Sequence, residues 1–167
     1  MSALPLQYTR MDSPIGELLL TGDGHALRGL HMMQGRRPVA VGADWLEADH
    51  AFEEVRAQLT DYFAGRRTSF DVPLQLEGTA FQREVWGGLL EIDYGETISY
   101  GELARRIGRP RAVRAVGLAN GRNPIAVIVP CHRVIGANGT LTGYGGGLES
   151  KRLLLDLESR LLAPAMF

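Results

Sequence analysis

Short apolar runs separated by turn residues dominate the first third of the chain. Residues 16–20 and 26–32 form two such runs, with glycines and aspartates between them. Apolar runs of this length between Gly and Asp turns are typical of strands joined by tight connections. The pattern predicts a small antiparallel sheet.

A helical period follows the predicted sheet. Apolar side chains then recur at steps of three, four and seven residues, at Trp45, Phe52, Val55, Leu59 and Phe63. This spacing places them on one face of an amphipathic helix, which residues 64–65, Ala and Gly, are expected to end.

Residues 70–76 contain Pro73 and therefore indicate an edge strand or a linker. A linker here divides the chain into an N-terminal α/β domain, residues 1–77, and a C-terminal domain, residues 78–167. The predicted fold class is α/β, with an antiparallel sheet in the small first domain. The second domain is expected to be mostly helical, with a helix-turn-helix of winged-helix type.

Helix signals are regular in the second domain. Thr79 can cap a helix whose apolar face carries Phe81, Val85, Trp86, Leu89 and Leu90. Ser99 can cap a second helix over residues 100–107, which the Gly-Arg-Pro sequence at 108–110 ends. A third helix over 111–119 completes a helix-turn-helix pattern, although helical hairpins are common in all α domains.

The helix predicted over 111–119 has an unusually smooth surface. Ala112, Ala115 and Ala119 fall on one of its faces, and Gly117 lies nearby. A helix that reads base edges in the major groove would need long polar side chains instead. A small-residue face suits close approach either to a minor groove or to another helix, and the sequence leaves both open.

Charge is unevenly distributed along a chain of 167 residues and net charge -1. Residues 44–61 hold six acids against one arginine, and residues 101–134 hold seven arginines, no lysine and one acid. Charge runs are usually solvated faces, but arginines clustered on a predicted helix-turn-helix favour contact with DNA phosphates.

No apolar run reaches the roughly 18 residues of a membrane helix, and the start does not look like a secretion signal. We therefore expect no membrane partner and a cytoplasmic location.

The chain has a single cysteine, Cys131, next to His132 and Arg133. Residues 125–129 are apolar and mostly β-branched, which predicts a buried strand that ends at this thiol. A neighbouring imidazole or guanidinium favours the reactive thiolate, so Cys131 is a candidate nucleophile, although an inert buried cysteine is the common alternative. If the strand continued, His132 would reach Cys131 only through a turn or a bridging water. One cysteine rules out an intrachain disulfide and a metal site built from cysteines, and we expect no metal and no cofactor.

Four segments resemble one family. The first is GRNPIAVIVPCHRVIG at 121–136, which contains PCHRVIG around the cysteine. The others are GYGGGLESKRLLLDLE at 143–158, TAFQREVW at 79–86 and ISYGELA at 98–104. Together they closely resemble the O6-alkylguanine-DNA alkyltransferases, over roughly residues 78–158. The opening sequence at 11–16, MDSPIG, is compatible with the bacterial branch of that family.

The resemblance implies a repair protein that acts once. Its partner would be double-stranded DNA that contains O6-alkylguanine. O4-alkylthymine in such DNA would be the second lesion that it repairs. Cys131 would accept the alkyl group, with His132 as its base and Glu158 orienting that base. Asn123 would tie the recognition helix to the site. The protein would be a monomer, and cooperative assembly on DNA is left open.

The resemblance also implies roles in reaching the lesion. A base inside a duplex must be flipped out before its exocyclic oxygen can meet a buried thiol. Arg114 would fill the gap in the stack, and Tyr100 would rotate the phosphate backbone. Ala112, Ala115 and Gly117 would lie against the DNA.

The alkyl pocket would be formed by the loop at 143–147 together with the segment before Cys131. Its expected walls are Tyr144, Gly145 and Ala126. Gly145 and Ala126 stand where some relatives carry Ser and Pro, and Val113 replaces a frequent alanine, so pocket size and the fit to DNA can differ from theirs. The same loop is Gly-rich and precedes a helix, but it lacks the Gly-Lys-Ser/Thr ending of a phosphate-binding loop.

Other functions have less support in the sequence. A non-catalytic lesion-binding relative of the family would lack the thiol that this chain retains, and a helix-turn-helix regulator would not need it. A thiol hydrolase would need an oxyanion hole, for which the sequence gives no sign.

Overall fold

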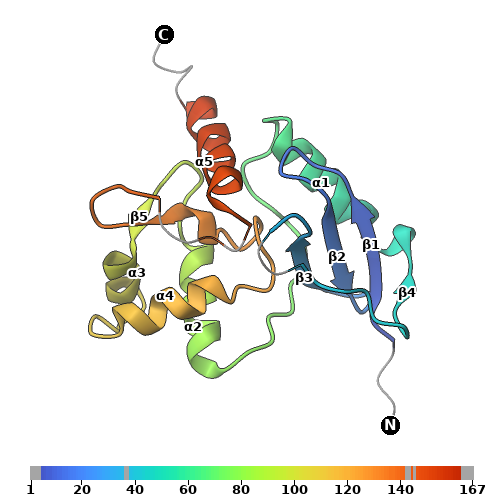
Figure 1. The fold of residues 1–167 in the computed structure, drawn as a ribbon, viewed down its shortest axis with the longest axis horizontal. Coiled ribbons are helices and arrows are strands. Elements are labelled where there is room, and N and C mark those ends of the chain that lie inside the picture. Colours follow the sequence, from blue (N-terminus) through green and yellow to red (C-terminus); the bar gives the residue numbers. More distant parts are fainter. Residues whose placement is uncertain (1–4, 36–37, 142–143, 145, 163–167) are drawn as a thin grey trace.

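The first half of the chain forms a four-stranded sheet. The computed structural model describes residues 5–35, 38–141, 144 and 146–162 (Figure 1). The strands are β1 (Gln7–Met11), β2 (Leu18–Gly22), β3 (Leu27–Met32) and β4 (Leu46–Glu47). Their order is β3-β2-β1-β4, and all neighbours are antiparallel except β1 and β4.

The predicted antiparallel sheet is confirmed, and the turns between its strands use the Gly and Asp residues expected. Gly16 and Gly24 have φ near +90°, which L residues with a side chain rarely adopt. Asp23 accepts hydrogen bonds from the backbone N–H groups of His25 and Ala26 at the β2–β3 turn. Every residue of β2 is buried, because this central strand has packing on both faces.

The helix after the sheet is shorter than its apolar period predicts. A 3-10 turn, η1 (Asp49–Phe52), leads into α1 (Glu53–Phe63), and Gly65 follows with φ +79°. The prediction that Trp45 lies on this helix is wrong. The next residues form β4 instead, where the N–H of Leu46 donates to the carbonyl of Leu6 at 2.9 Å. Backbone pairing with β1 therefore overrides the helical spacing.

Helices dominate the second half, as predicted. They are α2 (Ala80–Leu90), α3 (Tyr100–Arg106), α4 (Val113–Gly121) and α5 (Leu148–Leu162). Thr79 and Gln82 form a capping box at α2, and the Ser99 hydroxyl accepts from the N–H of Glu102 at the start of α3. Gly108, at φ +76°, lies in the turn after α3. Together, α3, this turn and α4 form the expected helix-turn-helix. A short parallel pair, β5 (Ile98–Ser99) with β6 (Val134–Ile135), lies beside them.

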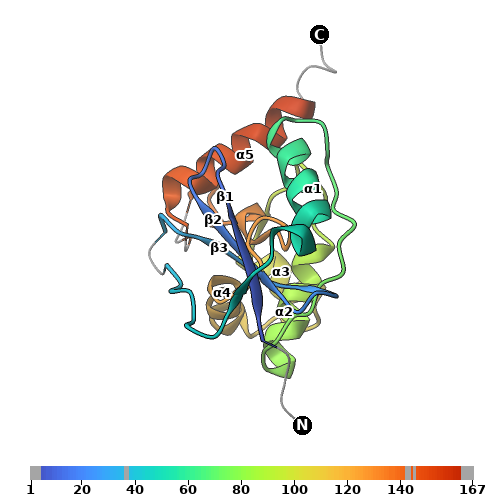
Figure 2. The same cartoon turned by 90° about the vertical axis from the view of Figure 1, so that its right-hand side faces the viewer.

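The two halves share one hydrophobic core. Leu18, Leu30 and Leu59 from the first half and Trp86 and Leu103 from the second belong to the same buried cluster. The Trp86 indole N–H donates to the carbonyl of Ala119 at 2.9 Å, which joins α2 to α4. Figure 2 shows α1 lying along the sheet with α5 at the same end of the molecule. None of the helices among the described residues is long and apolar enough to cross a membrane.

The free edge of β3 holds two later segments. The linker at 73–75 pairs with it through Leu27, whose N–H donates to the carbonyl of Pro73. Further along, the N–H of Leu30 donates to the carbonyl of Pro124 at 2.9 Å. The segment that leads to Cys131 is therefore anchored on the first-half sheet.

Candidate active site

The predicted strand over 125–129 is wrong. Only Ile125 pairs with a strand, through an isolated bridge to Leu30, and the chain then makes a tight turn. Val127 has φ +72°, and the N–H of Ile128 donates to the carbonyl of Ala126, which makes a γ-turn. A β-branched residue in this region costs of order 1–3 kcal/mol, so other contacts must hold the turn.

Asn123 supplies the contacts that hold this turn. Its side-chain amide donates to the carbonyl of Val129 at 2.7 Å, and its Oδ1 accepts from the N–H of Ile125 at 3.0 Å. The N–H of Val129 donates to the carbonyl of Ile125. Asn123 lies two residues after the end of α4, so the turn is fixed near the end of that helix.

Cys131 opens a 3-10 turn, η2 (Cys131–Arg133), rather than extending a strand. The thiol is 6% exposed and lines a cavity of about 300 Å³. Asn123, Ala126 and Tyr144 line the same cavity, which brings three sequence-predicted residues together with the thiol. Gly145, the fourth predicted wall, lies outside the described residues.

Two further sides of the cavity come from other elements. Residues 120–122, at the end of α4, form one side. His31 and Met32, at the end of β3, form the other. Met32 packs tightly on the loop before α5, because a Cβ added to Gly146 would collide with the Met32 sulfur. The first-half sheet therefore limits the space in front of Cys131.

Burial raises the pKa of the Cys131 thiol, and three neighbours act in the opposite direction. They are Asn123, the charged Lys151 and Tyr144. Burial also raises the pKa of Tyr144, and the negative charge of a Cys131 thiolate raises it further. The buried Tyr144 hydroxyl makes no hydrogen bond of good geometry with the described residues, although it is close enough to Cys131 to influence its pKa. The thiol is thus kept protonated until a base removes its proton.

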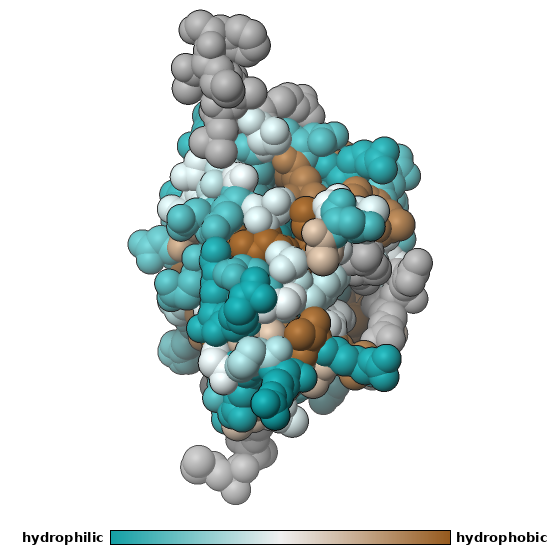
Figure 3. All heavy atoms as spheres, turned by 90° about the vertical axis from the view of Figure 1, so that its left-hand side faces the viewer, coloured by the Kyte–Doolittle hydropathy of each residue, from teal (hydrophilic) through white to brown (hydrophobic). Residues whose placement is uncertain are grey.

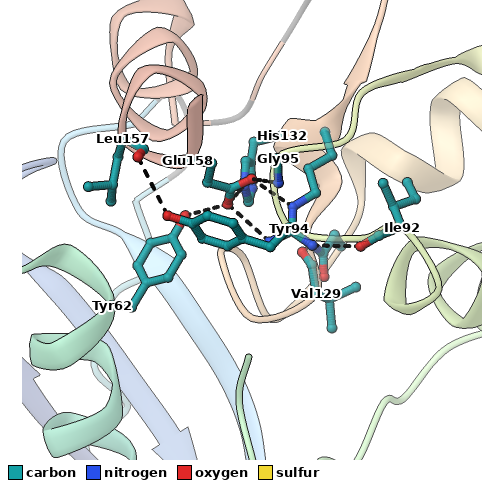
Figure 4. A network of polar contacts seen from close by, with 10 residues as sticks. Tyr62, Ile92, Tyr94, Gly95, Val129, His132, Leu157 and Glu158 are labelled. Carbon is teal, nitrogen blue, oxygen red and sulfur yellow. Dashed lines mark hydrogen bonds and ion pairs between the residues drawn. The ribbon is translucent and has the colours of Figure 1, made fainter. Parts of the chain in front are cut away.

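Glu158 is the centre of a buried polar network (Figure 4). Its Oε2 lies 2.7 Å from Nε2 of His132 and accepts the Tyr62 hydroxyl at 2.6 Å. Arg133 donates to both carboxylate oxygens, from Nε at 2.8 Å and from a terminal nitrogen at 3.1 Å. Burial of Glu158 opposes its ionisation, but the bonds from His132 and Arg133 outweigh burial and lower its pKa to about 2.

The ionised carboxylate decides the tautomer of His132. A carboxylate only accepts hydrogen bonds, so the ring nitrogen that faces it, Nε2, must carry the proton. Burial lowers the pKa of His132, which favours the neutral ring. Nδ1 then keeps a free lone pair, and this buried atom has no hydrogen-bond partner among the described residues. His132 therefore presents a base in the turn that carries Cys131.

Lys151 is the only lysine in the chain and is fully buried. Its Nζ donates to the carbonyl of Val134 at 2.7 Å and lies 6.0 Å from the centre of the Tyr144 ring. Burial lowers the pKa of Lys151, and a Cys131 thiolate raises it. A compact positive charge near the thiol favours the thiolate form.

The residues predicted to contact DNA gather on α3 and α4. Arg114 and Ala115 are exposed, and the Tyr100 ring lies close to Gly117, where an added Cβ would be 3.7 Å from it. Ala112 is half-buried, whereas Ala119 is buried in the core, so the small-residue face is only partly open. Leu118, which sequence reasoning missed, is 69% exposed on the same helix. Figure 3 views the molecule from the α3–α4 side, where hydrophilic residues surround smaller hydrophobic patches.

Pairing reduces the number of arginines free to contact phosphates. Arg105 pairs with Glu102, Arg106 with Glu96, and Arg109 with Glu84. Arg133, counted with the others in the sequence, is 7% exposed and also donates to the carbonyl of Ile92. Its guanidinium is used inside the protein, so Arg133 does not add to the exposed positive charge of this segment. The remaining exposed arginines of the segment are Arg111, Arg114 and Arg122.

Sequence reasoning missed three residues next to the site. Tyr62 and Met32 come from the first half of the chain and look there like ordinary core residues. Lys151 carried a signal, since a lone lysine among many arginines is unusual and lies in the GYGGGLESK segment. Within the described part of the chain, no group of three or more His, Cys, Asp or Glu residues could hold a metal ion.

Comparison with known proteins gives matches along most of the chain. Residues 6–76 match the family described as "6-O-methylguanine DNA methyltransferase, ribonuclease-like domain", and residues 80–160 match its "DNA binding domain". A methylated-DNA–protein-cysteine methyltransferase of Methanosarcina acetivorans is 56% identical over 153 residues, or 92% of this chain and 98% of that protein. One from Mycobacterium bovis is 56% identical over 160 residues, or 96% of each chain.

Solved structures agree with these matches. The crystal structure of Mycobacterium tuberculosis OGT in complex with DNA has a TM-score of 0.87 and 55% identity, covering 93% of this chain and 94% of that one. The O6-methylguanine-DNA methyltransferase of Pyrococcus kodakaraensis has a TM-score of 0.61 and 25% identity, covering 92% and 98%.

Proposed function

This chain belongs to the 6-O-methylguanine DNA methyltransferase family, and we propose that it moves an alkyl group from O6 of guanine in double-stranded DNA to Sγ of its own Cys131. The observation that supports this most is the position of Cys131. The only thiol lines a cavity and shares a turn with His132, whose ring is held by an ionised Glu158.

The transfer needs a thiolate at the moment the lesion arrives. Nδ1 of His132, directly or through a water, takes the thiol proton, and the sulfur then attacks the alkyl carbon. A carbon–sulfur bond forms and the carbon–O6 bond breaks. The electron pair of the broken bond leaves with guanine, and guanine then takes up a proton. The net change therefore moves the thiol proton from Cys131 to guanine.

Lys151 and Glu158 support this step with charge. The Lys151 ammonium offsets the negative charge that forms on sulfur, and Glu158 offsets the positive charge that forms on His132. Both charges already face the site before the reaction starts. Such preorganised groups lower the barrier because little has to move when charge develops.

The lesion must leave the base stack to reach this cavity. The end of α4 lines the cavity, and the exposed Arg114 lies on the same helix. We assign Arg114 to the gap left by the flipped base and Tyr100 to rotation of the phosphate backbone. Ala112, Ala115 and Gly117 allow close approach to the minor groove, and O4-alkylthymine is the expected second lesion.

The protein is used once. Thioethers are not reversed by thiol exchange, and no second cysteine is present to release the alkyl group. We propose that it works as a monomer, with a domain boundary between residues 77 and 78. A cytoplasmic location stays a prediction. A non-catalytic lesion-binding protein is the alternative, and the retained thiol in the cavity argues against it.

Intact mass is the direct test of this proposal. Incubation with a duplex that contains O6-methylguanine should add one methyl group per chain, at Cys131. Cys131→Ser should still bind DNA and gain no mass. Repeated turnover of excess lesion, or binding without any gain in mass by the wild-type chain, would contradict the proposal.

A further inference from the structure

Tyr62 lies in the first half of the chain, yet its hydroxyl reaches the polar network of the second half. The residue is on α1 and is fully buried. Its hydroxyl donates to Oε2 of Glu158 at 2.6 Å, across 96 residues of sequence. The same oxygen lies 2.7 Å from Nε2 of His132. One atom of Glu158 therefore serves both side chains (Figure 4).

We propose that Tyr62 is a positioning residue for alkyl transfer, which fixes the Glu158 carboxylate through Oε2 and so sets the orientation and basicity of His132. This inference rests on the proposed function, because it assigns a role in that reaction. It also gives the first half of the chain a direct part in the chemistry.

A structural role alone does not account for the partner that Tyr62 has. A buried phenol needs one acceptor, and any backbone carbonyl would satisfy it. The half-buried Tyr94 is bonded in this way, since its hydroxyl donates to the carbonyl of Leu157 at 3.5 Å. Tyr62 instead donates to Oε2 of Glu158, the carboxylate oxygen that also faces His132. A donor at this atom reduces the negative charge that faces the His132 ring.

Oε2 accepts from three donors: the Tyr62 hydroxyl, Nε2 of His132 and a terminal nitrogen of Arg133. The Tyr62 hydroxyl withdraws negative charge from Oε2, and less charge then remains to stabilise a protonated His132. Without this hydroxyl, Oε2 would hold more charge, and both His132 and Glu158 would protonate at higher pH. Tyr62 thus keeps His132 neutral, as a base must be before it accepts a proton.

Other groups around the carboxylate set the background for this effect. Glu158 Oε1 accepts from Arg133 and, at 3.4 Å, from the N–H of Gly95. Titratable and charged side chains face this network from five parts of the chain. They are Tyr62 on α1, Tyr94 in the loop after α2, Cys131, His132 and Arg133 in η2, Tyr144 in the loop before α5, and Lys151 on α5. Of these, Tyr62, His132 and Arg133 donate directly to the carboxylate.

The test uses the full chain and free O6-benzylguanine, which needs no flipping from DNA. Tyr62→Phe removes only the hydroxyl. We expect transfer to be about tenfold slower at the pH optimum, because the carboxylate that orients the His132 ring loses one of the hydrogen bonds that hold it in place. The acid limb of the pH–rate profile should shift to higher pH, because His132 then protonates more easily. Affinity for duplex DNA should not change. Tyr94→Phe, matched in chemistry and near the same network, should keep the wild-type profile.

A second variant covers the case in which Tyr62→Phe does not fold. Replacement of Tyr62 by 3-fluorotyrosine keeps the ring and the hydroxyl but makes the hydroxyl a stronger donor. It should shift the acid limb to lower pH, opposite to Tyr62→Phe. In addition, Tyr62→Phe should slow transfer little further in a Glu158→Gln background, because both changes act through the same oxygen.

The outcomes separate this inference from the proposed function. If the wild-type chain accepts no alkyl group, the proposed function fails. If the wild type reacts and the Tyr62 variants show its rate and pH profile, with only lower thermal stability, Tyr62 is a structural residue and the inference is overturned.

Discussion

Nε2 of His132 lies 2.7 Å from Oε2 of Glu158, and both side chains are at most 1% exposed. The ionised carboxylate fixes the proton on Nε2 and leaves Nδ1 as the basic nitrogen. The contact joins the turn that carries Cys131 to α5. It explains why the last helix of the protein belongs to the candidate site.

Glu158 should govern stability at low pH. Its folded pKa, about 2, lies below the ordinary glutamate value of 4.5, so its contribution is complete above about pH 4.5 and is lost as pH falls towards 2. A shift of this size corresponds to about 3 kcal/mol. Neutral His132, with its pKa also lowered, should begin to lose its own contribution below about pH 6.5.

Denaturant unfolding at a series of pH values measures this dependence. Glu158→Gln should lose a few kcal/mol at pH 7, because it leaves Arg133 buried without a counter-charge, and should not show the loss between pH 4.5 and 2. Glu149→Gln, at the exposed start of the same helix, serves as the control. An unchanged acid transition in Glu158→Gln would assign that loss of stability to other carboxylates.

Arg114 should matter for duplex DNA and not for the chemistry. Arg114→Ala is expected to slow repair of O6-methylguanine in a duplex roughly a hundredfold, from the loss of a few kcal/mol of flipped-state stabilisation. Reaction with free O6-benzylguanine should stay near the wild-type rate. Arg66→Ala, which removes an equal charge from the first half, controls for overall electrostatics. Equal losses on both substrates would show that Arg114 supports the pocket instead of the flipped state.

Lys151 should favour the thiolate of Cys131. Lys151→Met keeps most of the side-chain length and removes the charge, so the pKa of the thiol should rise. Transfer to free O6-benzylguanine is expected to be slower at pH 7 and to recover as the pH increases. Arg152→Met, at the next and exposed position of α5, should leave the pH profile unchanged. A loss that is the same at every pH would mean that Lys151 acts only through its bond to Val134.

Met32 should limit the size of the alkyl group. It lines the cavity in front of Cys131 and packs against Gly146. Met32→Ala should raise the rate with benzyl relative to methyl lesions by about tenfold, at a cost of about 2–5 kcal/mol in stability. Met33→Ala removes the same side chain from the next residue, which does not line the cavity. The assignment fails if both variants keep the wild-type ratio of rates.

The sequence by itself determined the elements whose signals are local. Thr79 and Ser99 begin their helices, and Gly108 ends one. A helix cap depends on a residue and the three that follow it, so a single sequence suffices to predict it. The motif around Cys131 likewise indicated the family, which the comparisons confirm.

Only the tertiary structure decided what depends on distant packing. The apolar run before Cys131 has strand propensity, but Asn123 and the edge of β3 hold it in a turn. Trp45 fits a helical period, but pairing of the next residues with β1 takes precedence. Arg133 looks like one of many surface arginines, and Tyr62 looks like a core residue. Their meeting at Glu158 joins segments up to 96 residues apart, and no short-range pattern carries that information because burial is decided by the whole chain.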